Sequence, residues 1–153
     1  QTYLEEIHKS EFRKLEVYYI WGKTGVGKTR SVMERYGSNV YRITSYSHPF
    51  DGYRGQDVIL FDEFYSSLPF EDMLKYTEGY AAQLPCRYAD KQACYTKVYI
   101  ISNVSLNEQY IIEQAKNKEK WKAFLRRITK QYEMLPPSEE NDGWTEIEGG
   151  ETF

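Results

Sequence analysis

Residues 22–29 are Gly22-Lys23-Thr24-Gly25-Val26-Gly27-Lys28-Thr29, and this stretch decides the fold. It matches G-x-x-x-x-G-K-[ST], the pattern of the phosphate-binding P-loop. An apolar run at 17–21 precedes it and a polar run at 30–35 follows it, which gives the strand, loop and helix that such a loop requires. Glycines let the backbone amides converge on one anion, and the helix start adds partial positive charge there. The stretch predicts binding of a nucleoside triphosphate, and the alternative is a glycine-rich turn that matches by accident.

The chemistry of a bound triphosphate suggests roles for single residues of this stretch. We expect Lys28 to reach the β- and γ-phosphates and the Thr29 hydroxyl to bind Mg²⁺. The predicted cofactors are therefore a nucleoside triphosphate and Mg²⁺. The residues expected to hold the nucleotide are Gly22, Lys23, Thr24, Gly25, Val26, Gly27, Lys28, Thr29 and Arg30.

Composition favours one globular domain, because 41% of the 153 residues are hydrophobic and 28% are charged. Residues 136–153 contain six acidic and no basic residues, so residues 1–135 hold 17 acidic against 20 basic residues. A mildly basic body is compatible with nucleic acid. No apolar run reaches the length of a membrane span, and no signal peptide is visible. The two cysteines have no metal-binding spacing, which indicates reduced thiols in an intracellular protein.

Hydrophobic patterning predicts strands that alternate with helices. Strands are expected at 16–21, 39–43, 58–61, 97–101 and 129–135, with a β-hairpin at 83–95. Helices are expected at 3–15, 28–36, 68–78, 107–114 with Asn107 as its cap, and 118–128. The continuous apolar run at 58–61 is typical of a strand buried on both faces of a parallel sheet. The fold class is therefore α/β, and the regions are a covering or oligomerising helix at 1–15, an NTPase domain at 16–135 and a flexible acidic tail at 136–153.

Polar side chains follow two more of the predicted strands. Asp62 and Glu63 come directly after 58–61, and Asn103 follows the strand that begins at Lys97. Ligands bind at the carboxyl ends of parallel strands, so these residues are expected beside the P-loop. We expect Asp62 to hold Mg²⁺, Glu63 to activate the attacking water and Asn103 to bond the γ-phosphate or that water. The alternatives are a solvated strand end for the two acids and a simple turn for Asn103.

Arg126 and Arg127 lie near the end of the last predicted helix, and two interpretations stay open. They are either cations that favour the helix dipole or an arginine finger offered to the nucleotide of a neighbouring subunit. Two other enzyme classes fit poorly. A GTPase would need N-K-x-D after a strand, and a small-molecule kinase would need a lid with several arginines, where residues 68–95 supply only Arg87.

The order of these motifs resembles the superfamily 3 helicase domain of Rep initiator proteins, from circular single-stranded DNA viruses and related rolling-circle plasmids. The resemblance covers residues 17–135 and rests on Asp51-Gly52-Tyr53 with Gly55, Phe61-Asp62-Glu63-Phe64-Tyr65, Ile101-Ser102-Asn103 and Arg126-Arg127-Ile128-Thr129. It implies an AAA+-like three-layer sandwich with an inserted hairpin. It also implies Asp62 and Glu63 as the Walker B acids, Asn103 as the sensor asparagine, and Arg126 or Arg127 as the finger in trans.

The resemblance also implies a track and partners. In this family a basic residue of the hairpin, usually Lys before Gly, touches DNA in the pore of a ring. Here the pattern departs from that, and Arg87 is the first candidate and Lys91 the second. The implied partners are single-stranded DNA, a homo-hexamer, and an upstream HUH endonuclease domain in the full-length chain. We expect an ATP-dependent DNA helicase motor; the alternatives are a nucleotide-regulated interaction module without translocation and a related viral-type RNA helicase.

Overall fold

The computed structural model describes residues 13–23, 27–80, 82–134 and 144–146. Within them a six-stranded sheet has the order β2-β3-β6-β1-β7-β8, and β4 and β5 form a separate hairpin. All neighbouring strands of the large sheet are parallel except β7 and β8. The strands are β1 Glu16–Trp21, β2 Val40–Ile43, β3 Val58–Phe61, β4 Gln83–Leu84, β5 Lys91–Gln92, β6 Lys97–Ser102, β7 Lys130–Met134 and β8 Trp144–Glu146.

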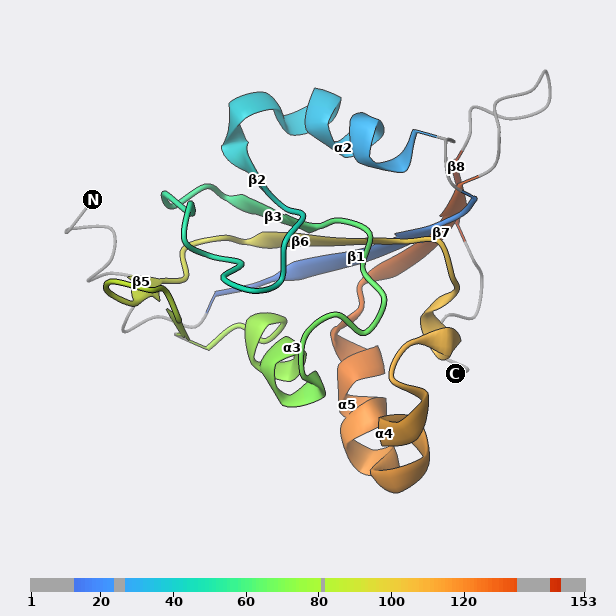
Figure 1. Ribbon diagram of the computed structural model, residues 1–153. Coiled ribbons are helices and arrows are strands. Elements are labelled where there is room, and N and C mark those ends of the chain that lie inside the picture. The colour runs from blue at the N-terminus through green and yellow to red at the C-terminus, as the bar shows by residue number, and fades with distance from the viewer. Residues whose placement is uncertain (1–12, 24–26, 81, 135–143, 147–153) are drawn as a thin grey trace, which may run out of the picture.

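Helices cover both faces of the sheet and complete three layers (Figure 1). Helix α2 lies on one face, and α3, α4 and α5 lie on the other. Their bounds are α2 Lys28–Tyr36, α3 Phe70–Tyr76, α4 Ile111–Lys116 and α5 Lys118–Arg127, with short 3₁₀ turns η1 at Gly37–Asn39 and η2 at Leu106–Glu108. None of the helices in the described ranges is long and apolar enough to cross a membrane. The α/β fold class predicted from the sequence is confirmed.

Strand β3 shows why the sequence of a central strand is a continuous apolar run. All four of its residues have no exposed surface. Val58 and Leu60 pack with Val32 of α2, while Ile59 and Phe61 belong to the larger core that includes Phe70 of α3 and Phe124 of α5. Because both faces are covered, alternation of polar and apolar residues is lost in the central strands.

Most predicted elements are confirmed. The bounds of β1, α2 and β3 agree with the prediction, α2 ends where Gly37 follows it with φ +58°, and β6 runs one residue further, to Ser102. Strands β2 and β7 and helix α5 lie within a residue of the expected positions. The hairpin is present, although each of its strands has two residues.

The helix predicted at 107–114 is wrong in its first half. A 3₁₀ turn at Leu106–Glu108 comes first, Tyr110 has φ +51°, and α4 begins only at Ile111. The cause is the fully buried Gln109, whose amide nitrogen donates to Tyr19 Oη, to the Phe64 carbonyl and to Ser102 Oγ. A continuous helix through this position could not place the side chain in that network. Asn107 therefore does not cap α4; its Oδ1 accepts a bond from Ser105.

Two other expectations are corrected or fall outside the described ranges. Helix α3 is two residues shorter at each end than predicted: Pro69 is its N-cap residue, and Thr77, whose hydroxyl donates to the Met73 carbonyl, is its C-cap residue. The predicted helix at 3–15 lies mostly outside the described residues, but 13–15 are not helical. There the Arg13 amide donates to the Gly79 carbonyl and its guanidinium to the Tyr95 carbonyl. The tail at 136–153 is described only at Trp144–Glu146, where it adds β8.

Candidate active site

The register of the parallel strands brings the predicted site residues to one edge of the sheet. Strand β6 lies between β1 and β3: its Ser102 pairs with Trp21 of β1, and its Ile100 pairs with Phe61 of β3. The loop after β1, the acids after β3 and Asn103 after β6 therefore leave the sheet side by side. This is the carboxyl edge, where open α/β sheets bind ligands.

The described part of the P-loop shows why two of its glycines are needed. A Cβ atom on Gly22 would lie 2.4 Å from the Met134 carbonyl oxygen of β7. Gly22 also donates its amide to the Ser102 carbonyl at 3.2 Å, so the chain leaves β1 pressed between two strands. Gly27 has φ +85° at the N-cap of α2, a conformation that glycine adopts without steric cost. Thr24, Gly25 and Val26 lie outside the described residues.

The Lys28 side chain lies against the P-loop and is fixed there by hydrogen bonds. Its Nζ donates to the carbonyls of Gly22 and Lys23, both at 2.9 Å, and to Asn103 Oδ1 at 3.1 Å. Only 7% of the residue is exposed. Burial lowers the pKa of Lys28, and the nearby Asp62 carboxylate opposes that shift. The ammonium group is thus prepositioned among neutral acceptors, and a phosphate group would be its first anionic hydrogen-bond partner.

Asp62 is a buried carboxylate with donors on both oxygens. Oδ1 accepts from Thr29 Oγ1 at 2.7 Å and from the Glu63 amide at 2.9 Å. Oδ2 accepts from Arg42, at 2.8 Å from Nε and 2.7 Å from a terminal nitrogen. The Asp62 side chain is 3% exposed, so its charge depends on these donors.

Thr29 and Asp62 fit a Mg²⁺ ion. Mg²⁺ prefers oxygen ligands and binds in nucleotide sites through one or two carboxylates together with phosphates and water. The hydroxyl and the carboxylate already lie within hydrogen-bonding distance of each other at the cavity wall. The Mg²⁺ ligands predicted from the sequence are therefore adjacent in space.

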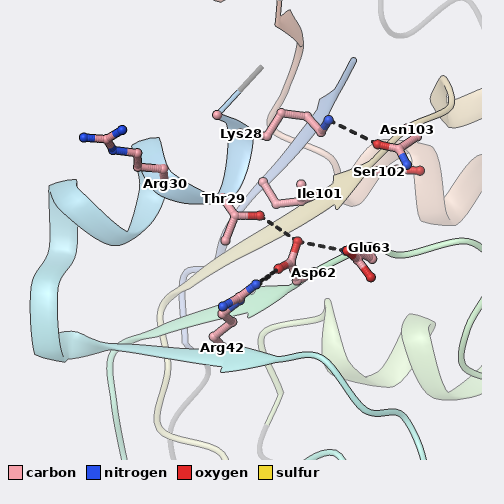
Figure 2. Close-up of a pocket in the computed structure, with 10 residues that line it drawn as sticks. Lys28, Thr29, Arg30, Arg42, Asp62, Glu63, Ile101, Ser102 and Asn103 are labelled. Atoms are coloured by element: carbon pink, nitrogen blue, oxygen red, sulfur yellow. Dashed lines mark hydrogen bonds and ion pairs between the residues drawn. The ribbon is translucent and has the colours of Figure 1, made fainter. Parts of the chain in front are cut away.

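Glu63 differs from Asp62 in its surroundings. It is exposed, has φ +49° and lines the same cavity. Within the described residues no hydrogen bond or ion pair holds its carboxylate. The turn after β3 thus buries the first acid of the pair and leaves the second free to face a ligand or water (Figure 2).

These side chains surround a cavity of about 290 Å³. Figure 2 shows Lys28, Thr29, Asp62, Glu63 and Asn103 around it. Arg30 also borders it, but its guanidinium is directed away and pairs with Glu34 at 2.8 Å. The arrangement combines a fixed cation, two oxygen ligands for a metal and a free carboxylate, which is what phosphoryl transfer to water requires.

A protein-family model described as RNA helicase matches residues 18–105, which is more than half of the chain. The chain belongs to this helicase family. Relatives named "Replication-associated protein" include those of Canary circovirus, 33% identical over 76% of this chain, of Beak and feather disease virus, 34% over 59%, and of Goose circovirus, 32% over 81%. The chain spans 38%, 30% and 40% of these three proteins, respectively. The resemblance to the superfamily 3 helicase domain of Rep proteins is thereby confirmed.

Arg126 and Arg127, which the helicase motif does not distinguish, differ in their contacts. Arg127 donates to the Leu74 carbonyl at 3.2 Å and pairs with Glu78 at 3.3 Å, so it ties α5 to α3. Arg126 is exposed, and within the described residues no partner holds its side chain. Both lie near Thr129, which bonds Val17 at the start of β1, whereas the P-loop follows the end of that strand. Neither arginine is therefore beside the cavity of its own helicase domain.

The two basic residues predicted to grip DNA are both engaged within the chain. Arg87 pairs with Asp51 at 2.5 Å, and Lys91 donates to the carbonyls of Phe50 and Asp51. Asp51 opens the Asp51-Gly52-Tyr53 stretch, so these bonds attach the β4–β5 hairpin to that turn. The hairpin lies at the edge of the sheet opposite the P-loop (Figure 1). Its tip residue Tyr88 is 97% exposed.

Arg42 lines the cavity and pairs with Asp62, although no sequence pattern predicted it as a site residue. It lies on β2, one residue before the strand ends at Ile43. Ile43 pairs with Phe61, so Arg42 reaches the carboxylate that follows β3. The available signal was a charged residue at the carboxyl end of a short predicted strand, which marks the ligand edge of a parallel sheet.

Proposed function

We propose that this chain is the ATP-dependent DNA helicase motor of a rolling-circle replication initiator, which hydrolyses ATP to move along single-stranded DNA and unwind duplex. The observation that carries the proposal is the convergence of Lys28, Thr29, Asp62, Glu63 and Asn103 on one cavity at the carboxyl edge of the sheet. The family match and the circovirus relatives support the same reading.

In this proposal the loop and α2 bind the triphosphate. Lys28 exchanges its carbonyl acceptors for the β- and γ-phosphates, and the amide groups at the start of α2 face the same anion. Thr29 and Asp62 would hold Mg²⁺, and the ion would supply positive charge to the phosphate groups. The fold already holds Lys28, Thr29 and Asp62 at the positions that these roles require.

Glu63 is the group proposed to activate water. Its exposed carboxylate lines the cavity beside Asp62 and would accept the proton of the attacking water. Asn103, whose oxygen now accepts from Lys28, would orient that water or the γ-phosphate. Proton transfer and positioning are thus divided between the ends of β3 and β6.

The remaining positive charge would come from a second copy of the chain. Arg126 is exposed and lies near the amino edge of its own sheet, so its guanidinium is available to a neighbour and remote from its own nucleotide. A head-to-tail ring, for which we propose six subunits, would place Arg126 of each subunit at the next active site. Hydrolysis would then be coupled around the ring.

The proposed track is single-stranded DNA, contacted by the β4–β5 hairpin. The Arg87 side chain remains 58% exposed in its pair with Asp51, so it can meet a phosphate without leaving that partner. Lys91 is held by main-chain carbonyls and would position the hairpin. We also propose that the full-length protein carries an HUH endonuclease domain upstream.

The description of the matching family favours one specific alternative, an RNA track. Comparing single-stranded DNA with RNA of the same sequence as stimulants of ATP hydrolysis separates the two. A larger rise with RNA would replace DNA by RNA in the proposal. Nucleotide binding without strand displacement on either substrate would favour the nucleotide-regulated interaction module.

The central experiment compares the wild-type chain with Lys28→Ala. The wild type is expected to hydrolyse ATP, faster with single-stranded DNA, and to displace a strand from a tailed duplex. Lys28→Ala is expected to lose at least about 100-fold in hydrolysis, because the charge on the transferred phosphate loses its fixed partner. Lys116→Ala removes an exposed lysine of α4, outside the nucleotide-binding stretch, and serves as the control. Hydrolysis that survives Lys28→Ala would contradict the proposal.

A further inference from the structure

We infer that Arg42 takes the place of the metal ion at Asp62. Its guanidinium pairs with the Asp62 carboxylate when no Mg²⁺ is bound and must release this carboxylate when the ion binds. The inference depends on the proposed function only in taking the metal to accompany a nucleotide. It assigns a positioning role to a residue outside the P-loop, the Walker B acids and Asn103.

The contacts of Arg42 converge on a single oxygen. Its Nε and one terminal nitrogen lie 2.8 and 2.7 Å from Asp62 Oδ2. Thr29 occupies the other oxygen of the same carboxylate, Oδ1, at 2.7 Å. The guanidinium and the proposed metal site therefore share one carboxylate, with the arginine on one oxygen and the hydroxyl ligand on the other (Figure 2).

Burial explains why Asp62 needs a cation at all times. A carboxylate that is 3% exposed is strongly disfavoured unless it is paired and hydrogen-bonded. The guanidinium supplies this charge in the structure as it stands. A divalent cation on the same group would supply it instead, and the two cations would repel each other at this short range.

Arg42 is also placed to leave. Its side chain is 47% exposed, whereas its partner is buried, and the head lines the cavity together with Lys28 and Asn103. Released from Asp62, it would stay at the wall of the nucleotide cavity as a free cation beside the phosphates.

Metal binding without nucleotide tests the exchange directly. Mn²⁺ replaces Mg²⁺ as the probe, because free and bound Mn²⁺ are distinguished by electron paramagnetic resonance. We expect Arg42→Gln to bind Mn²⁺ at least about five-fold more tightly than the wild type, since the competing cation is gone. Arg54→Gln removes the same charge from an exposed turn residue and should leave the Mn²⁺ affinity unchanged.

Two further variants keep the result interpretable. Arg42→Lys retains a cation but has one nitrogen, and it should bind Mn²⁺ with an affinity between those of the wild type and Arg42→Gln. The double variant Arg42→Gln with Asp62→Asn should lose the gain. A gain that survives in the double variant, or unchanged affinity in both Arg42→Gln and Arg42→Lys, would overturn the inference.

A second titration separates this inference from the proposed function. A fluorescent ATP analogue at fixed concentration is titrated with Mg²⁺, and Arg42→Gln should reach half-maximal binding at a lower Mg²⁺ concentration than the wild type. Failure of the wild type to bind the analogue, with the Mn²⁺ difference intact, would reject the proposed function and support the exchange. Normal binding of the analogue with no Mn²⁺ difference would support the proposed nucleotide site and reject the exchange.

Discussion

Thr29 Oγ1 donates a 2.7 Å hydrogen bond to Asp62 Oδ1, and this bond joins the first turn of α2 to the end of β3. The two residues are 33 positions apart in the sequence. Their contact places a hydroxyl and a carboxylate, both oxygen ligands, at one point of the cavity wall. The bond shows that the proposed metal ligands are assembled by the fold.

Replacing Thr29 tests this assembly. We expect Thr29→Ala to raise the Mg²⁺ concentration for half-maximal ATP hydrolysis at least about ten-fold, because one oxygen ligand is lost, and to cost about 1–2 kcal/mol of folding free energy, because a bond to a charged group is lost. Thr29→Ser keeps the hydroxyl and should stay close to wild type. Hydrolysis at graded Mg²⁺ and urea unfolding measure the two effects. Equal Mg²⁺ dependence in the alanine and serine variants would contradict the assignment.

Gly22 gives a prediction about stability. Gly22→Ala would place a Cβ atom 2.4 Å from the Met134 carbonyl oxygen, so β1 and β7 must separate. We expect a loss of about 1–3 kcal/mol in the free energy of unfolding, as for overpacked sites. In Gly52→Ala the nearest atom would be Cε1 of the Tyr41 ring at 3.3 Å, and the loss should stay within about 0.5 kcal/mol. Urea unfolding of both variants measures the difference, and equal losses would contradict this account of Gly22.

Local patterns predicted much of the fold and most of the cavity. Strand β3 and the loop at Gly22 are specified by neighbouring residues: a continuous apolar run in one case and a glycine motif in the other. Asp62 and Asn103 could be placed because each follows directly on a buried strand. In each case the information lies within about ten residues of the feature, which is the range of sequence periodicity.

Contacts between distant segments could not be predicted in the same way. Gln109 interrupts the expected helix because it bonds Tyr19, 90 residues away. Arg42 joins the site because β2 and β3 pair in a particular register, and Arg87 is engaged because Asp51 lies 36 residues before it. Such partners depend on tertiary structure, so the residue types alone left these roles open.

Arg126 and Arg127 should respond differently to replacement by alanine. Arg127→Ala is expected to lower the free energy of unfolding by about 1 kcal/mol, because the pair with Glu78 and the bond to Leu74 are lost. Arg126→Ala should leave stability within about 0.5 kcal/mol, since the side chain is exposed, but reduce ATP hydrolysis at least about 100-fold. Urea unfolding and steady-state hydrolysis measure both effects.

Mixing two inactive variants tests whether Arg126 acts in trans. In a ring of Lys28→Ala and Arg126→Ala subunits at equal amounts, roughly a quarter of the interfaces join an intact Lys28 to an intact Arg126. Hydrolysis should therefore return to a comparable fraction of the wild-type rate. Mixtures of Lys28→Ala with wild type calibrate subunit exchange. No recovery despite exchange would place Arg126 outside the neighbouring site.

The buried Tyr19 predicts loss of stability at high pH. Its hydroxyl donates to the Val104 carbonyl at 2.7 Å and accepts from Gln109 at 3.0 Å. Burial raises the pKa of Tyr19 to about 12, against an ordinary value near 10, although bonds from Ser102 and Gln109 oppose the shift. The unfolded chain therefore releases this proton first as pH rises. The contribution of Tyr19 is full below about pH 10 and is lost between about pH 10 and 12, by about 2–3 kcal/mol in total.

Tyr19→Phe isolates that contribution from those of the other tyrosines. At pH 8 the wild type should be the more stable by about 1–2 kcal/mol, because the variant leaves the Gln109 amide short of an acceptor. From pH 10 to 11 this difference should shrink by about 1 kcal/mol, since only the wild type has the Tyr19 proton to lose on unfolding. Tyr88→Phe, at a position 97% exposed, should keep the pH dependence of the wild type. Urea unfolding from pH 8 to 11 measures all three proteins, and a constant difference between the wild type and Tyr19→Phe would contradict the raised pKa.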